Sequence, residues 1–118
     1  MVLKHPIIFF KLPETVVAHL TPVQIDPAVS TAVDGKAELA VIIGTVWRGI
    51  SRADAMKHVW GYTIINDVTA RDLQGKYSQW LIGTSLDTFC PMGPWAVSAD
   101  ELNLGTAGVT CWVTGELR

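Results

Sequence analysis

The sequence has little charge and few cysteines. Only 17% of its 118 residues are charged, whereas typical soluble domains contain about a quarter. The formal net charge is -2 and no cluster of Lys and Arg is present, which argues against nucleic acid as a partner. The two cysteines, Cys90 and Cys111, match neither a zinc-site spacing nor a disulfide framework. A reduced, cytoplasmic protein is therefore expected.

Long apolar runs are also missing. No run approaches the roughly 18–20 residues that span a bilayer, so no membrane segment is predicted. Lys4, Pro6 and Lys11 interrupt the short apolar stretch near residue 1, which argues against a signal peptide. The length predicts one domain over residues 1–118. Hydrophobic residues nevertheless reach 49% and include five tryptophans, so we expect a partner subunit or further structure to cover apolar surface.

Hydrophobic patterns predict strands separated by one helix. The strands are expected at residues 6–11, 38–44, 62–68, 93–97 and 109–113, with 21–27 as an edge strand or an extended loop. The run at 38–44 is β-branched and continuous, which predicts that both of its faces are covered. A helix is expected from Ser51, where Asp54 completes a start signal, to Gly61. This order predicts an α+β fold with mainly antiparallel pairing.

The last residues have the pattern of an unfinished hairpin. Val113 ends a strand, Thr114 and Gly115 form a turn, and a return strand begins without being completed. An open strand edge of this kind is usually avoided in folded proteins. We therefore expect the chain to lack a C-terminal continuation.

Acidic residues at the ends of two apolar strands are the candidate site. Glu38 opens the run at 38–44 and Asp67 ends the run at 62–68. Further polar residues lie close by in sequence: Asn66, Thr69, Arg71, Asp72 and Gln74. Carboxylates brought together at strand ends suit a hard divalent cation such as Mg²⁺. The alternative is that Glu38 and Asp67 are solvated or paired with Arg71.

Several long blocks resemble the fumarylacetoacetate hydrolase family. Residues 6–11 resemble its Pro-x-x-Phe-x-Lys strand, and residues 34–44 its Asp-Tyr-Glu-x-Glu-Leu-x-Val-Val-Ile-Gly block. Residues 61–74 resemble its Gly-Tyr-x-x-x-Asn-Asp-Val-Thr-Ala-Arg-Asp-x-Gln block, and residues 85–95 continue in register. The resemblance covers nearly the whole chain. It implies a mainly antiparallel β roll or sandwich of that type, incomplete at both ends.

The resemblance also implies an activity and a set of site residues. Members are hydrolases, decarboxylases or isomerases of 2-oxo and β-diketo acids, in which Mg²⁺ or Mn²⁺ stabilises an enolate. Glu38 and Asp67 match the second and third metal carboxylates. Gln74 matches a polar residue near the substrate, and Arg71 a partner of the metal corner. The expected partners are a small 2-oxo acid and a second copy of the chain or a complementing chain.

Four departures from the family pattern leave three hypotheses open. The first metal carboxylate falls on Lys36, and the lysine that polarises the substrate falls on Thr84. The lid with its His-Glu pair would precede Pro6, and the C-terminal half with its Thr-Gly-Thr-Pro segment is absent. The chain is then the central portion of an active enzyme, a catalytically inactive relative, or a subunit completed by a second chain.

Lys36 leads to a specific prediction about metal binding. Residues 36 and 38 are two apart on an extended segment, so their side chains leave the same face. If Glu38 points into the corner, the ammonium of Lys36 stands where the charge of a metal ion would be. Repulsion between that ammonium and a divalent ion at about 4 Å is roughly 8 kcal/mol at an effective dielectric constant of about 20. We therefore expect poor Mg²⁺ binding, unless Lys36 extends into solvent instead.

Overall fold

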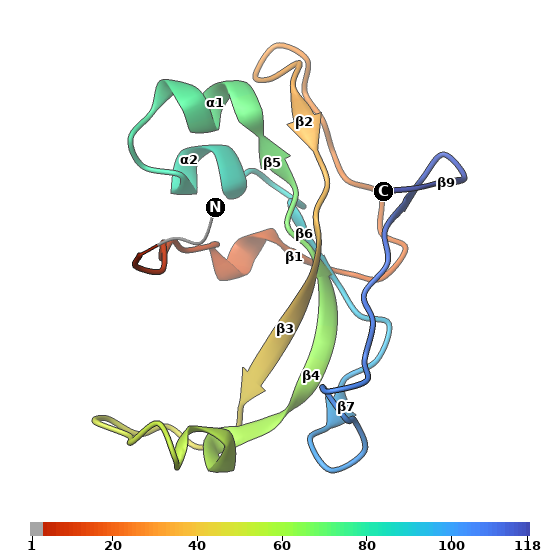
Figure 1. The fold of residues 1–118 in the computed structure, drawn as a ribbon. Coiled ribbons are helices and arrows are strands. Elements are labelled where there is room, and N and C mark those ends of the chain that lie inside the picture. The colour runs from red at the N-terminus through yellow and green to blue at the C-terminus, as the bar shows by residue number, and fades with distance from the viewer. Residues whose placement is uncertain (1–3) are drawn as a thin grey trace.

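The structure, a computed structural model, describes residues 4–118 and centres on one sheet (Figure 1). Within these residues the sheet has five strands in the order β1-β6-β4-β3, with β7 also paired to β4. Its strands are β1 (Val16–Ala18), β3 (Ala37–Ile43), β4 (Val59–Asn66), β6 (Cys90–Met92) and β7 (Val97–Ser98). Only β1 and β6 pair in parallel among the described strands. The prediction of an α+β fold with mainly antiparallel pairing is confirmed.

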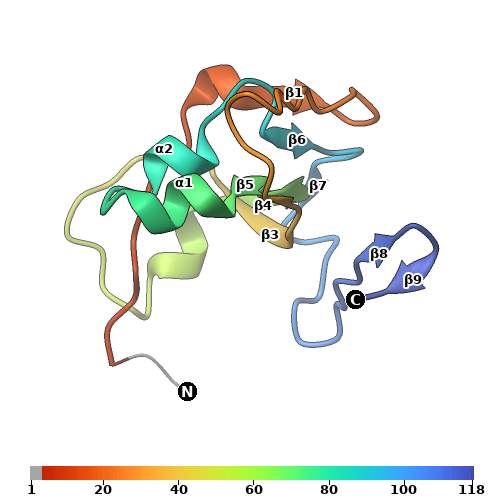
Figure 2. The same ribbon diagram turned by 90° about the horizontal axis from the view of Figure 1, so that it is seen from above.

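Two short strand pairs complete the β structure. They are β2 (Val33–Asp34) with β5 (Thr69–Ala70), and β8 (Trp112–Val113) with β9 (Glu116–Leu117). The predicted turn at residues 114–115 is confirmed, but the return strand β9 is present, contrary to the expectation of an unfinished hairpin. Seen from above, this hairpin stands to one side of the sheet, away from the helices (Figure 2).

β3 and β4 form the long curved hairpin at the centre of Figure 1. They pair from Ala37 opposite Asn66 to Ile43 opposite Val59. The strand expected at 38–44 is therefore confirmed, since its β-branched residues favour a pleated surface. The expectation that both faces are covered is wrong for this chain, because Leu39, Val41 and Ile43 are 39%, 50% and 59% exposed. These residues form an apolar face that the chain itself leaves open.

The helix predicted for residues 51–61 is wrong. The Ser51 hydroxyl does donate to an Asp54 carboxylate oxygen at 2.6 Å, and the Asp54 N–H donates to Ser51 Oγ at 3.2 Å. This turn leads only to the short 3-10 helix η2 (Ala55–His58), and β4 begins directly at Val59. The β-branched and aromatic residues that follow favour a strand, and pairing with β3 outweighs the local helical spacing.

Other helices lie where none was expected. They are η1 (Pro13–Thr15), α1 (Arg71–Lys76) and α2 (Leu81–Thr84), and α1 and α2 lie together beside β5 (Figure 1). Sequence periodicity could not reveal α1 and α2, because they contain six and four residues and therefore less than two turns each. Among the described residues, no helix has the length and hydrophobicity needed to cross a membrane.

Two further strand predictions need correction. Residues 6–11 form no strand and lie mostly exposed, since no described strand pairs with them. Residues 21–27 form an extended loop, which was one of the two alternatives. The strand expected at 93–97 is wrong except at Val97, where β7 begins, because residues 93–96 are irregular and Gly93 has a φ of 126° that a regular strand does not adopt.

The core of the described chain is small. The buried apolar residues are Tyr62, Val68, Ala70, Phe89 and Cys90. The radius of gyration is 15.9 Å, whereas a compact domain of this length has a value of about 13–14 Å. Large apolar side chains remain exposed, among them Trp47, Trp95 and Trp112 at 68%, 76% and 65%. The high hydrophobic content thus corresponds to open apolar surface rather than to a large core.

Candidate functional site

The candidate site lies where two adjacent extended segments of the chain both leave regular strand structure, at positions that face each other. One interruption separates β2 from β3 at residues 35–36, and the other separates β4 from β5 at residues 67–68. The Asp67 N–H donates to the Lys36 carbonyl at 2.9 Å, and the Lys36 N–H donates to Asn66 Oδ1 at 2.9 Å. These two bonds hold Lys36 beside Asp67, although the regular strand pairing stops there.

Asp67 is the buried centre of the site. Its side chain is only 1% exposed, and a buried carboxylate is costly unless it is paired. Lys11 Nζ donates to Asp67 Oδ1 at 2.6 Å, and Lys36 Nζ donates to Asp67 Oδ2. Lys11 also donates to the carbonyl oxygens of Val68, at 3.2 Å, and Thr84. Two ammonium groups therefore saturate one buried carboxylate from two sides.

Glu38 joins the same cluster at its solvent side. Its Oε1 lies 3.4 Å from Lys36 Nζ, and its side chain is 43% exposed, against 26% for Lys36. The Lys36 ammonium therefore lies between the carboxylates of Glu38 and Asp67, on the face shared by residues 36 and 38. We refer to Lys11, Lys36, Glu38 and Asp67 as the charged corner. Its formal charges sum to zero.

Three residues expected at the site lie beside the charged corner rather than in it. The Arg71 guanidinium donates to Asp34 Oδ2 at 2.6 and 3.0 Å and to Gln74 Oε1 at 3.0 Å. No ion pair joins Arg71 to Asp67 or Glu38 in residues 4–118, so the alternative pairing with Arg71 is wrong. Thr84 is fully buried and reaches the corner through its carbonyl oxygen, which accepts from Lys11.

Sequence reasoning did not identify Lys11 as a site residue. The partners Lys11 and Asp67 are 56 residues apart, so no local spacing connects them. The available signal was a lysine at the end of the apolar Pro-x-x-Phe-x-Lys block, where burial would require an anionic partner.

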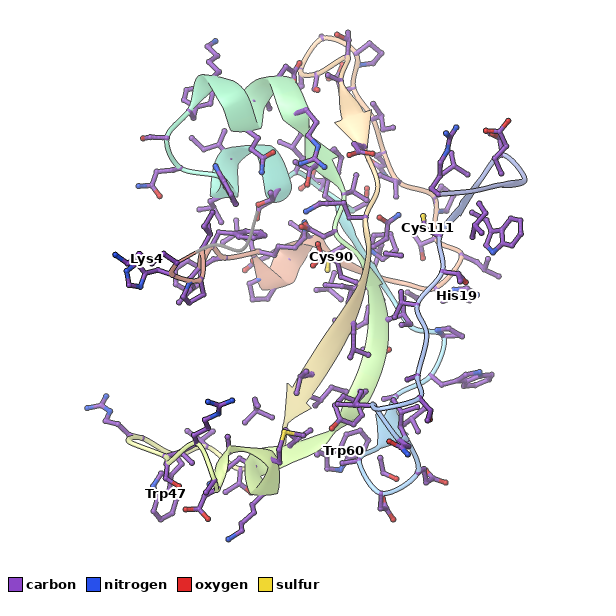
Figure 3. The ribbon with its side chains drawn as sticks, in the orientation of Figure 1. Lys4, His19, Trp47, Trp60, Cys90 and Cys111 are labelled. Atoms are coloured by element: carbon purple, nitrogen blue, oxygen red, sulfur yellow. The ribbon has the colours of Figure 1, made fainter. Side chains whose placement is uncertain are left out.

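Cys90, which lies beside the corner, and Asp72, which lies on α1, have shifted pKa values. Burial raises the pKa of the Cys90 thiol, and the nearby Lys11 ammonium only partly opposes this effect. Cys90 is buried and lies near the middle of the molecule in Figure 3, an environment in which a thiol is unreactive. A hydrogen bond donated by the Ser30 hydroxyl lowers the pKa of Asp72, which lies on α1.

A cavity of about 350 Å³ lies on the opposite side of β3 from the charged corner. Ala37 lines it together with His19, Asn66 and Cys111, and successive residues of a strand point to opposite faces. Figure 3 shows His19 and Cys111 on the same side of the molecule. The cavity and the charged corner are therefore separate features.

The residues of the charged corner do not fit the divalent metal that the family resemblance implies. Both oxygens of Asp67 already accept from ammonium groups, and no buried side-chain N or O atom of the described residues lacks a partner. Residues 4–118 contain no group of three His, Cys, Asp or Glu side chains able to hold a metal. An ion bonded to both Glu38 and Asp67 would fall where Lys36 Nζ lies.

Comparison with known proteins agrees with this arrangement of blocks and strands. The family model for the fumarylacetoacetate (FAA) hydrolase C-terminal domain matches residues 2–118. The chain belongs to the fumarylacetoacetate hydrolase family. It is 47% identical over 116 residues to the oxaloacetate tautomerase YisK of Bacillus subtilis, covering 98% of this chain and 38% of that protein.

Solved structures show the same fold. The fumarylacetoacetate hydrolase of Exiguobacterium antarcticum matches with a TM-score of 0.90 and 44% identity, over 93% of this chain and 40% of that one. The 5-carboxymethyl-2-hydroxymuconate delta-isomerase of Mycobacterium smegmatis matches with a TM-score of 0.91 and 36% identity, over 98% and 45%. The chain thus spans less than half of the length of these relatives.

Proposed function

We propose that the chain is part of an enzyme acting on small 2-oxo acids and that the charged corner is its reacting site. The observation that carries the proposal is the position of the corner on the matched blocks, where Glu38 and Asp67 lie. Relatives are named for the tautomerisation of oxaloacetate and for the hydrolysis of maleylpyruvate. Both substrates contain a 2-oxo-carboxylate, and both reactions pass through an enol or enolate.

The proposed chemistry is proton transfer at the carbon next to the 2-oxo group. Glu38 presents a half-exposed carboxylate that can take the proton from C3. The electron pair of the broken C–H bond forms the C2–C3 double bond, and the carbonyl pair moves onto the 2-oxo oxygen. Lys36 places a positive charge beside that oxygen, a proton from solvent added to the oxygen completes the enol, and the half-exposed Glu38 returns its proton to solvent. Asp67 would position the ammonium groups of Lys11 and Lys36.

The metal-dependent form of this chemistry, with Mg²⁺ or Mn²⁺, is not part of the proposal, because Lys36 occupies the position of the ion. Gln74 lies on α1, where it accepts a hydrogen bond from Arg71 and is outside the charged corner. We propose that neither Gln74 nor Arg71 contacts the reacting atoms. Thr84 would act through its carbonyl oxygen, which helps to hold Lys11.

A second candidate is a non-catalytic or incomplete subunit. The observation that favours it is the exposed apolar surface, with Leu39, Val41 and Ile43 open on one face of β3. A second copy of the chain, or a complementing chain, would bury this face. An incomplete subunit would be active only in that assembly, whereas a non-catalytic one would not be active at all.

Hydrogen exchange at C3 of oxaloacetate, followed by NMR in heavy water with a chelator present, tests the proposal. The native chain is expected to accelerate exchange over buffer, and Glu38→Gln is expected to abolish the acceleration. Arg48→Glu is the control, since Arg48 lies exposed in the loop between β3 and η2. Exchange at the buffer rate, together with no oxaloacetate binding, would support the second candidate instead.

A further inference from the structure

The charged corner contains its own cation at the position where a divalent ion would have to bind. Lys36 Nζ contacts Asp67 Oδ2 and lies 3.4 Å from Glu38 Oε1. A divalent ion needs several oxygen ligands at about 2.0–2.6 Å, so an ion shared by these two carboxylates would overlap the ammonium. The second oxygen of Asp67 is bound to Lys11 at 2.6 Å and offers no alternative position.

We infer that Lys36 replaces a divalent metal in this chain and makes the charged corner independent of Mg²⁺ and Mn²⁺. A buried carboxylate needs a compensating positive charge, and Asp67 receives that charge from Lys36 and Lys11. The corner is therefore electrically neutral without any metal. The inference rests on these contacts and not on the proposed activity, so each can fail without the other.

A single substitution should reverse this property. Lys36→Glu removes the resident cation and adds a third carboxylate on the face that already presents Glu38. Because the formal charge of the corner falls from zero to minus two, the variant should bind divalent ions. Its stability should then depend on the metal, since an ion that binds only the folded chain stabilises it by mass action. The native chain should show neither effect.

Titration with Mn²⁺, in which electron paramagnetic resonance measures the free ion, tests the inference directly. The native chain and Arg48→Glu are expected to show no site tighter than millimolar. Arg48→Glu changes the net charge by the same amount in the exposed loop after β3. Lys36→Glu is expected to bind Mn²⁺ at least about tenfold more tightly than either, with a thermal midpoint that rises only when Mn²⁺ is added.

Any of three results would overturn the inference. The first is sub-millimolar Mn²⁺ binding by the native chain that Glu38→Gln weakens, because Lys36 would then have moved away from the corner. The second is folded Lys36→Glu that binds Mn²⁺ no better than Arg48→Glu. If Lys36→Glu does not fold even with Mn²⁺, Lys36→Met decides: tighter binding than the native chain supports the inference, and equal binding refutes it. The oxaloacetate exchange assay on the native chain tests the proposed activity, and its outcome does not bear on metal binding.

Discussion

Removal of the Lys11 ammonium should destabilise the chain more than removal of any exposed lysine. Lys11 is 13% exposed, Asp67 is 1% exposed, and their ion pair measures 2.6 Å. Lys11→Met keeps the length of the side chain but leaves one oxygen of Asp67 and two carbonyl oxygens without their donor. Breaking a buried ion pair from one side costs about 3–5 kcal/mol.

The Lys36 ammonium lowers this cost, because it still contacts the other oxygen of Asp67. We therefore expect Lys11→Met to lower the free energy of unfolding by about 3 kcal/mol, the lower end of the range for a broken buried pair. Lys36→Met should cost less, about 1–2 kcal/mol, because Lys36 is 26% exposed. The double variant should lose more than the sum of the two, since Asp67 would then be buried with no cation at all.

Urea unfolding, followed by tryptophan fluorescence at one protein concentration, measures these differences. Lys57→Met is the matched control, because its partner is Asp54 and both side chains are well exposed, at 75% and 49%. Exposed pairs of this kind contribute about 0–1 kcal/mol. A cost for Lys11→Met that equals the cost of Lys57→Met would refute the argument. So would strictly additive costs in the double variant.

Three further predictions concern other parts of the chain. Gly61→Val should destabilise the chain by about 2–3 kcal/mol, because a Cβ there would clash with the Val97 carbonyl oxygen. Gly75 lies in an open position of α1, so Gly75→Ala should instead stabilise the chain by about 0.5–1 kcal/mol in the same urea assay. Because burial raises the pKa of Cys90 and leaves less thiolate at pH 8, a disulfide reagent should label native Cys111 first, and faster labelling of Cys90 would contradict this. Sedimentation should show species heavier than the 12.8 kDa chain, and a monomer that persists on dilution would oppose the prediction of a partner.

Local patterns predicted the parts of the fold that depend on neighbouring residues. The β-branched run at 38–44 predicted β3 almost to its ends, because strand preference is a property of the segment and its alternating faces. The same alternation predicted that Lys36 and Glu38 share a face, and the structure places their charged groups 3.4 Å apart. The family followed from long blocks whose order is also a linear property of the chain.

Local patterns were misleading where long-range pairing competes with them. Residues 51–61 contain a helix start signal and an apolar stripe, yet β4 begins at Val59 because it pairs with β3 over seven residue pairs. Residues 6–11 have the composition of a buried strand but find no neighbour to pair with among the described residues. In both segments the deciding interaction is with a strand elsewhere, which periodicity does not describe.

The sequence by itself determined the family, the strand content and the presence of a positive charge beside Glu38. Only the tertiary structure decided which groups that charge contacts. Asp67 contacts Lys36, 31 residues away in sequence, and Lys11, 56 residues away. The contact with Lys36 forms where the strand pairing stops between β2 and β3 and between β4 and β5. The physical reason is that burial of a carboxylate depends on all the groups that surround it in space, and the chain brings those groups together only when it folds.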